Sequence, residues 1–161
     1  MIKIQHLIYL TLILPFLISC GFSPILKNVD LDSVKINKIE FSGSESLTYY
    51  LKTNLNMVIN NQSADAYALK IKINESASTV TKNTAGITTE EKIIITINFQ
   101  IISSKGNIVG SETLTDDRVI TITNDISTDD EVKRIEKENI MTNLIQQLTF
   151  AVRAKIISLQ K

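Results

Sequence analysis

The sequence predicts an α+β fold, a two-layer sandwich in which two helices cover one face of a four-stranded, mainly antiparallel sheet. Two observations predict it. Several segments alternate apolar with polar residues, and two others repeat apolar residues every three or four positions. The expected order is β-α-β-β-β-α. Because each element has one apolar side, these elements bury their apolar sides by stacking as two layers.

The first strand is expected over residues 34–41, "VKINKIEF". Its apolar parity changes between Ile36 and Ile39, which indicates a β-bulge or a misplaced boundary. A helix should follow, because Ser42 and Glu45 have the spacing of a capping box. This helix would end in the polar stretch "NNQS". Its expected apolar positions are Leu47, Leu51, Leu55 and Val58.

Three further strands are expected. Residues 65–74, "DAYALKIKIN", alternate apolar residues with lysines, which predicts a strand with one solvated face. Residues 92–101, "KIIITINFQI", alternate in the same way. The polar stretch between them is either a long loop or the flared ends of two strands. "SSKGN", with Gly106, predicts a hairpin turn before a more polar strand over residues 108–122. The apolar face of 92–101 would hold Ile93, Ile95, Ile97, Phe99 and Ile101.

The last element is a long helix. Thr128 and Glu131 suggest a second capping box, and Asp129 and Asp130 in the first turn favour the helix dipole. At about 1.5 Å per residue, an unbroken helix from here would span well over 40 Å. Its expected apolar positions are Val132, Ile135, Met141, Leu144, Leu148, Val152, Ile156 and Leu159.

Residues 1–19 have the layout of a secretory signal, with a basic start, an apolar run and a small residue at its end. The apolar run is too short for a transmembrane helix, which needs about 20 residues. Leu17, Ile18, Ser19 and Cys20 match a lipobox. Its chemistry attaches a diacylglycerol to the thiol, cleaves after Ser19 and acylates the new amine, with palmitate as the expected chain. An ordinary cleaved signal peptide is the alternative.

This interpretation divides the chain into a signal peptide (1–19), a lipidated Cys20 with its tether (20–33) and one α+β domain (34–161). Several acyl chains make a stable anchor, at about 0.8 kcal/mol per buried methylene. Lipidation predicts a bacterial, periplasm-facing protein. By similarity to other lipoproteins, Gly21 rather than Asp after the cysteine favours sorting to the outer membrane.

Composition excludes several classes of function. Residues 1–19 hold one of the 17 basic residues and none of the 17 acidic ones, so the mature chain has a net charge of −1. A nucleic-acid-binding protein would show a basic excess. The only histidine, His6, leaves with the signal, and the only thiol is the lipidation site. Ser-His or Cys-His catalysis and a His/Cys zinc site are therefore excluded. We expect no enzyme, no catalytic residue, no metal and no cofactor.

The adjacent carboxylates Asp116 and Asp117 are not expected to form a catalytic pair either. Neighbouring residues of a strand point to opposite faces, so these two cannot easily share a substrate. The acidic residues near 129 are explained by the helix start.

Four features together resemble the LPS-assembly lipoprotein family, LptE, over essentially the whole mature chain. They are "CGF" at residues 20–22, the β-α-β-β-β-α order, the hairpin "ITINFQIISSKGNIV", and "TNDISTDDE" before a helix that ends in "LTFAVRAKIISL". The resemblance implies a non-enzymatic lipoprotein of the cell outer membrane. Members of this family plug the β-barrel of LptD, help it to assemble, and are associated with lipopolysaccharide on its way to the cell surface.

A barrel plug needs a polar, nearly neutral outside, because large membrane barrels have polar interiors. The expected solvated faces, with Lys70, Lys72, Thr96, Asn98 and Gln100, have this character, although they would also suit simple solvent exposure. Lipopolysaccharide phosphates would need Lys or Arg. A stand-alone periplasm-facing lipoprotein that binds a small ligand or peptidoglycan remains the alternative. The candidate lipopolysaccharide contacts, in loops or strand ends, are Lys82, Lys92, Lys105 and Arg118.

Overall fold

The structure is a computed structural model that describes residues 35–59 and 66–159. All of them belong to one compact unit of the chain. The expected signal peptide, Cys20 with its tether, and the "NNQS" end of the first helix lie outside the described residues.

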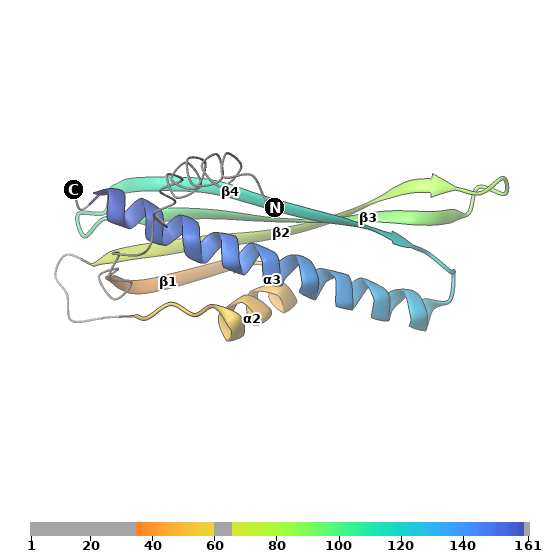
Figure 1. Cartoon of the computed structure of the whole chain (residues 1–161), viewed down its shortest axis with the longest axis horizontal. Helices are drawn as coiled ribbons and strands as arrows, with labels where there is room; N and C mark the ends of the chain where they lie inside the picture. The colour runs from red at the N-terminus through yellow and green to blue at the C-terminus, as the bar shows by residue number, and fades with distance from the viewer. Residues whose placement is uncertain (1–34, 60–65, 160–161) are drawn as a thin grey trace, which may run out of the picture. The chain divides into compact units, whose positions relative to one another are not determined.

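The described elements follow the expected β-α-β-β-β-α order (Figure 1). The sheet has the strand order β1-β2-β3-β4, with β1 parallel to β2 and the other neighbours antiparallel. The predicted fold class is therefore confirmed. A parallel pair needs a crossover connection, and α2 lies in it. The elements are β1 (Ile36–Gly43), α2 (Glu45–Asn54), β2 (Tyr67–Lys82), β3 (Thr88–Ile102), β4 (Ile108–Thr121) and α3 (Ile126–Leu159).

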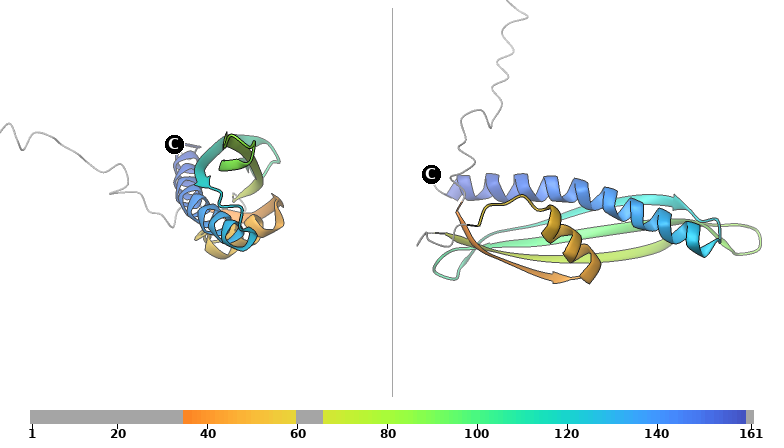
Figure 2. Two further views of the ribbon diagram at one scale, coloured as in Figure 1. Left: turned by 90° about the vertical axis from the view of Figure 1, so that its right-hand side faces the viewer. Right: turned by 90° about the horizontal axis from the view of Figure 1, so that it is seen from below.

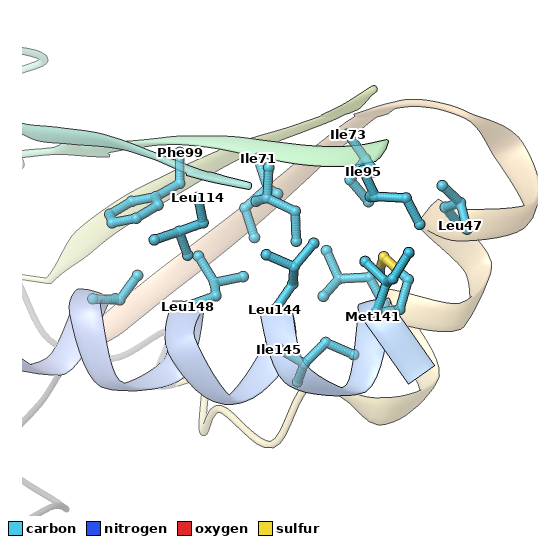
Figure 3. Close-up of a cluster of buried hydrophobic side chains, with 14 of the residues drawn as sticks. Leu47, Ile71, Ile73, Ile95, Phe99, Leu114, Met141, Leu144, Ile145 and Leu148 are labelled. Carbon is cyan, nitrogen blue, oxygen red and sulfur yellow. The ribbon is translucent and has the colours of Figure 1, made fainter. Parts of the chain in front are cut away.

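The hydrophobic core lies between the sheet and α3, which runs across one face of the strands (Figures 1 and 2). Met141, Leu144 and Leu148 point from α3 toward the sheet (Figure 3). Each of these side chains is fully buried, and burial of this kind contributes about 1.5–3 kcal/mol per side chain. The sheet side of the core confirms the predicted alternation, with Leu69, Ile71, Ile73, Ile93, Ile95, Ile97, Phe99 and Ile101 all buried.

The bulge expected in the first strand is present, because the β1–β2 register shifts between Ile36 and Lys38. The capping box expected at Ser42 is wrong. Ser42 still belongs to β1, and its hydroxyl donates to the carbonyl of Ile71 (3.4 Å). Gly43 follows with φ +112°, and a Cβ there would lie 1.9 Å from the carbonyl oxygen of Ile73. The close approach of two strands, rather than a cap, therefore sets this helix start.

The first helix is also shorter than expected. It ends at Asn54, and Leu55 is already extended, with φ −76° and ψ 107°. The Asn54 amide donates to the carbonyl of Tyr50 (2.8 Å), a local bond that competes with further helix. Val58, expected on its apolar side, is 73% exposed.

The second capping box, at Thr128, is wrong as well. α3 begins two residues earlier, and the Asp125 carboxylate accepts the backbone N–H of Thr128 (3.0 Å). Ile135 and Leu159 are exposed rather than buried, while Ile140 and Ile145 belong to the core. With 34 residues, α3 is about 50 Å long, consistent with the expected span.

The polar stretch between the second and third strands forms the ends of two strands, so the flared-strand alternative is correct. β2 and β3 continue to Lys82 and Thr88, and Asn83 closes the turn by accepting the N–H groups of Ala85 and Ile87. This hairpin extends past the first turn of α3 (Figures 1 and 2). The other predicted turn is confirmed at Gly106, with φ +82°.

Candidate functional site

The four candidate lipopolysaccharide contacts do not form one cluster. Lys82 ends β2 beside the β2–β3 turn, whereas Lys105 lies in the β3–β4 turn at the other end of β3. β3 has 15 residues, which separates its two ends by about 50 Å at roughly 3.3 Å per residue. These two lysines cannot contact the same headgroup.

Lys92 and Arg118 lie on opposite sides of the sheet. Lys92 forms an ion pair with Asp117 (Nζ–Oδ2, 3.0 Å), and Arg118 forms one with Asp116 (3.1 Å). Asp116 also accepts a hydrogen bond from Asn143 of α3 (2.8 Å), so it faces the helix. The expectation that the two aspartates point to opposite faces is confirmed.

The sheet face away from α3, here called the outer face, carries mainly neutral polar side chains. The hydroxyls of Thr96 and Thr115 lie 3.2 Å apart, and Thr113 donates to Asn98 (2.7 Å). Among the described elements, none packs on this face. It comprises Lys70, Lys72, Thr96, Asn98, Gln100, Thr113, Thr115 and the Lys92–Asp117 pair.

At the β1 edge of this face, one carboxylate is shared by two lysines. Glu40 lies 2.7 Å from Lys38 and 3.6 Å from Lys70. Hydrogen bonding from Lys38 lowers the pKa of Glu40, so this carboxylate is charged at neutral pH. The outer face therefore presents neutral hydrogen-bonding groups and ion pairs, together with Lys72, which has no carboxylate partner among the described residues.

A cleft of about 290 Å³ lies between α2 and the first half of α3. Its floor is apolar, and the Tyr50 hydroxyl meets that of Thr142 (3.1 Å) where the two helices approach each other. Cations and carboxylates surround the floor. The lining residues are Ser46, Leu47, Tyr50, Asp130, Lys133, Arg134, Lys137, Glu138 and Met141.

Each cation of this cleft already has a carboxylate partner. Arg134 lies between Glu131 (2.7 Å) and Glu138 (2.6 Å), and the hydrogen bonds that it donates to these two carboxylates raise its pKa. Lys133 and Lys137 reach across to Glu91 and Glu75 of the sheet. An anionic ligand would have to displace these partners. The sequence alone predicts no site here, although the Glu131–Arg134–Glu138 spacing is typical of paired charges on a helix.

A buried carboxylate shapes the corner between β4 and α3. Asp129 is 8% exposed and accepts three hydrogen bonds, from the N–H and hydroxyl of Thr123 and from the N–H of Asn124. The backbone bond from Thr123 is the largest cause that lowers the pKa of Asp129. Asn124 has φ +65°, so these bonds also hold an uncommon backbone conformation. The role of this group is structural.

Within residues 35–59 and 66–159, no group of three or more His, Cys, Asp or Glu side chains is arranged to hold a metal ion. In the same part of the chain, no helix combines the length and the apolar character needed to cross a membrane.

No protein-family model and no curated protein sequence matches this chain. Solved lipoprotein structures do share its fold. Rare lipoprotein B from Shewanella oneidensis matches with a TM-score of 0.59 and 16% identity, over 78% of this chain and 100% of that one.

Two other lipoprotein structures match over similar lengths. A minor lipoprotein from Acinetobacter baumannii has a TM-score of 0.55 and 22% identity, covering 73% of this chain and 91% of that one. Lipoprotein B from Nitrosomonas europaea has a TM-score of 0.55 and 10% identity, covering 75% and 86%. At these identities, the shared feature is the fold.

Proposed function

We propose that this chain is an outer-membrane lipoprotein of the LptE type that plugs an LptD-like β-barrel and helps it to assemble for lipopolysaccharide insertion. The observation that carries the proposal is the fold shared with rare lipoprotein B over the whole of that structure. Rare lipoprotein B is another name for LptE. The lipobox at Leu17–Cys20 gives independent support from the sequence.

The outer face of the sheet suits a polar barrel lumen. Its threonine and asparagine pairs are neutral, and its charged residues at Lys92 and Glu40 are paired. Neutral hydrogen-bonding groups can exchange water for a polar wall at little cost, whereas an unpaired charge cannot. A plug would therefore be expected to have a surface that is mostly neutral or paired, and on this face Lys72 is the exception.

Affinity purification of the C-terminally tagged protein from its native membrane in mild detergent tests this proposal. A large β-barrel protein should be recovered in near-equal amounts. Recovery of the lipoprotein alone, with lipopolysaccharide export intact after its depletion, would refute the plug role.

The anchor has its own test. Radiolabelled fatty acid should enter the wild-type chain at Cys20 and be absent from the Cys20→Ala variant. Equal label in both would contradict the lipobox interpretation, and no label in either would favour the ordinary cleaved signal.

Direct contact with lipopolysaccharide through Lys82, Lys92, Lys105 or Arg118 is a further part of the proposal. Lys82 and Lys105 have no ion pair within the described part of the chain, so they are the better candidates for phosphate. Lys82→Glu should weaken lipopolysaccharide binding if the site lies at the β2–β3 turn, and Lys105→Glu should weaken it if the site lies at the β3–β4 turn. Lys92→Glu should weaken binding less, since Lys92 is already paired with Asp117. Unchanged binding in all variants would remove these residues from the proposal.

The second candidate function is a stand-alone periplasm-facing lipoprotein that binds a small ligand or peptidoglycan. The cleft between α2 and α3 favours it, because an apolar floor beneath charged groups is a common form of ligand site. In this case the purification would yield no barrel, and Ser46→Trp, which would fill the cleft from an exposed lining position, would abolish ligand binding.

A further inference from the structure

The outward side of α3 changes character along the helix. Its first part, as far as Glu138, is densely charged, and the next charged residue is Arg153. Exposed helix surfaces are normally charged or mixed. A long uncharged stretch on an exposed helix therefore calls for a physical explanation.

The inward side of this stretch belongs to the core, but its outward side does not. Gln146, Phe150 and Ala154 follow one another at single-turn spacing, and all three are exposed, Phe150 to 53%. We call this surface the amide face. It consists of Asn139, Gln146, Gln147, Phe150 and Ala154.

Groups beside the amide face are already engaged with the domain. Asn143 donates to Asp116 on β4, and the Thr142 hydroxyl donates to the carbonyl of Glu138 (2.8 Å). The nearest cations point away from the face as well. Arg153 donates to the carbonyl of Asn56 (3.4 Å) on the α2 side.

The other nearby cation, Lys155, lies over β4. Its side-chain carbons would be 2.9 and 3.2 Å from a Cβ at Gly110. The exposed surface left between these two flanks consists of neutral amides around one aromatic ring.

The chemistry of the amide face selects among possible occupants. Lipid hydrocarbon would leave the amides of Gln146 and Gln147 without hydrogen bonds, at a cost of roughly 1–3 kcal/mol each, and Asn139 with only its bond to Glu136 (3.3 Å). Phosphate groups would need cations, which this face lacks. A protein wall of neutral polar groups can satisfy the amides and cover Phe150.

The size of the face argues against self-association through it. From Asn139 to Ala154 the strip is about 24 Å long and about 10 Å wide, or roughly 240 Å². A stable interface buries about 800 Å² on each partner. The amide face can therefore be only one part of a larger contact, as expected for a partner that surrounds the domain.

We propose that the amide face of α3 is a surface through which this domain contacts the inner wall of the β-barrel, with Phe150 as its central anchor. This inference rests on the proposed plug function and adds which helix surface meets the wall. Interface cores typically lack charges and are enriched in aromatic residues. The amide face likewise has no charged residue and contains Phe150.

Ile135 offers a matched control. Like Phe150, it is an exposed apolar residue on α3 (42% against 53%), but it lies in the charged part of the helix. In the tagged full-length protein, Phe150→Lys should reduce the recovered barrel about tenfold, because burial of an unpaired charge disrupts an interface core. Ile135→Lys should reduce it by less than about twofold. Both variants must retain the wild-type helicity and thermal midpoint.

Photocrosslinking provides the second measurement, with p-benzoylphenylalanine in place of Phe150 or of Ile135. Crosslinks to the barrel from position 150, and few from position 135, would support the proposal. Two results would overturn the proposal for the amide face and leave the plug function standing. One is equal loss of the barrel in the two lysine variants, and the other is crosslinking from position 150 to a second copy of this chain. Absence of any barrel with the wild-type chain would refute the plug function itself.

Discussion

The two halves of α3 cover the same sheet by different means. The C-terminal half packs Leu144, Leu148 and Val152 onto fully buried strand residues. The N-terminal half reaches the sheet through ion pairs, Lys133 with Glu91 (2.9 Å) and Lys137 with Glu75 (2.5 Å). The apolar core therefore ends partway along the helix, while helix and sheet both continue.

The strand sequence explains this boundary. On the core-facing side of β2, Leu69, Ile71 and Ile73 are followed by Glu75 and then by smaller residues. Pairing with β3 continues, because backbone hydrogen bonds and polar cross-strand contacts do not require a core. We call the hairpin beyond Ile93, residues 78–92, the ribbon.

The largest effect is expected from Phe99→Ala in the covered part of the sheet. Phe99 is 1% exposed, so the substitution leaves a cavity and should lower the free energy of unfolding by about 3–5 kcal/mol. Chemical denaturation of the purified protein measures it. The control is Ile87→Ala at the tip of the ribbon, where the side chain is 47% exposed and the change should stay within about 0.5 kcal/mol. Equal losses would show that the ribbon shares the core's stability.

A smaller loss is expected from Asp129→Asn at the start of α3, because an amide replaces a carboxylate that accepts three hydrogen bonds. The folded state lowers the pKa of Asp129, so this carboxylate stabilises the fold above its unfolded pKa. That contribution is lost as the pH falls through the lower, folded pKa. The difference in stability between wild type and variant should therefore be constant near neutral pH and shrink below about pH 4. A pH-independent difference would contradict this explanation.

The next effect concerns the ion pairs under the N-terminal half of α3. A double-mutant cycle of Lys137→Met and Glu75→Gln should give a coupling of about 0.5–1 kcal/mol, since both side chains are only partly exposed. It should weaken in high salt. The exposed Lys38–Glu40 pair is the control and should show less coupling. A salt-independent coupling at Lys137 would indicate packing rather than charge.

Much of the fold could be predicted, because apolar alternation depends only on which side of a strand is buried. This alternation correctly predicts the inward residues of β2 and β3, and the change of apolar parity after Ile36 correctly predicts the bulge. Helix starts could not be predicted as well. The start of α2 depends on Gly43 passing close to Ile73, and that of α3 on the bonds of Asp125 and Asp129, which are set by the folded chain.

Candidate contacts were harder to predict than the fold. The place of Lys92 near a strand end predicts a free cation, but the fold puts it beside Asp117. The α2–α3 cleft arises where Tyr50 meets Thr142, a contact between residues far apart in the sequence. Charge on a single residue says little about its availability until its partners are known.

The smallest effect is expected in the ribbon itself. Thr79 and Thr88 contact each other only through exposed hydroxyls (3.4 Å), so Thr79→Ala should change the free energy of unfolding by less than about 0.5 kcal/mol. Its influence should instead be local. Few apolar contacts hold the ribbon, so its amide hydrogens should exchange faster than those of Ile71 and Phe99, and faster still in the variant. Hydrogen exchange measured residue by residue checks this. If the ribbon amides are as protected as those of the core, strand pairing alone extends the core's stability past Glu75. The two halves of α3 would then differ in the kind of contact they make with the sheet, while the strands beneath them would be equally stable.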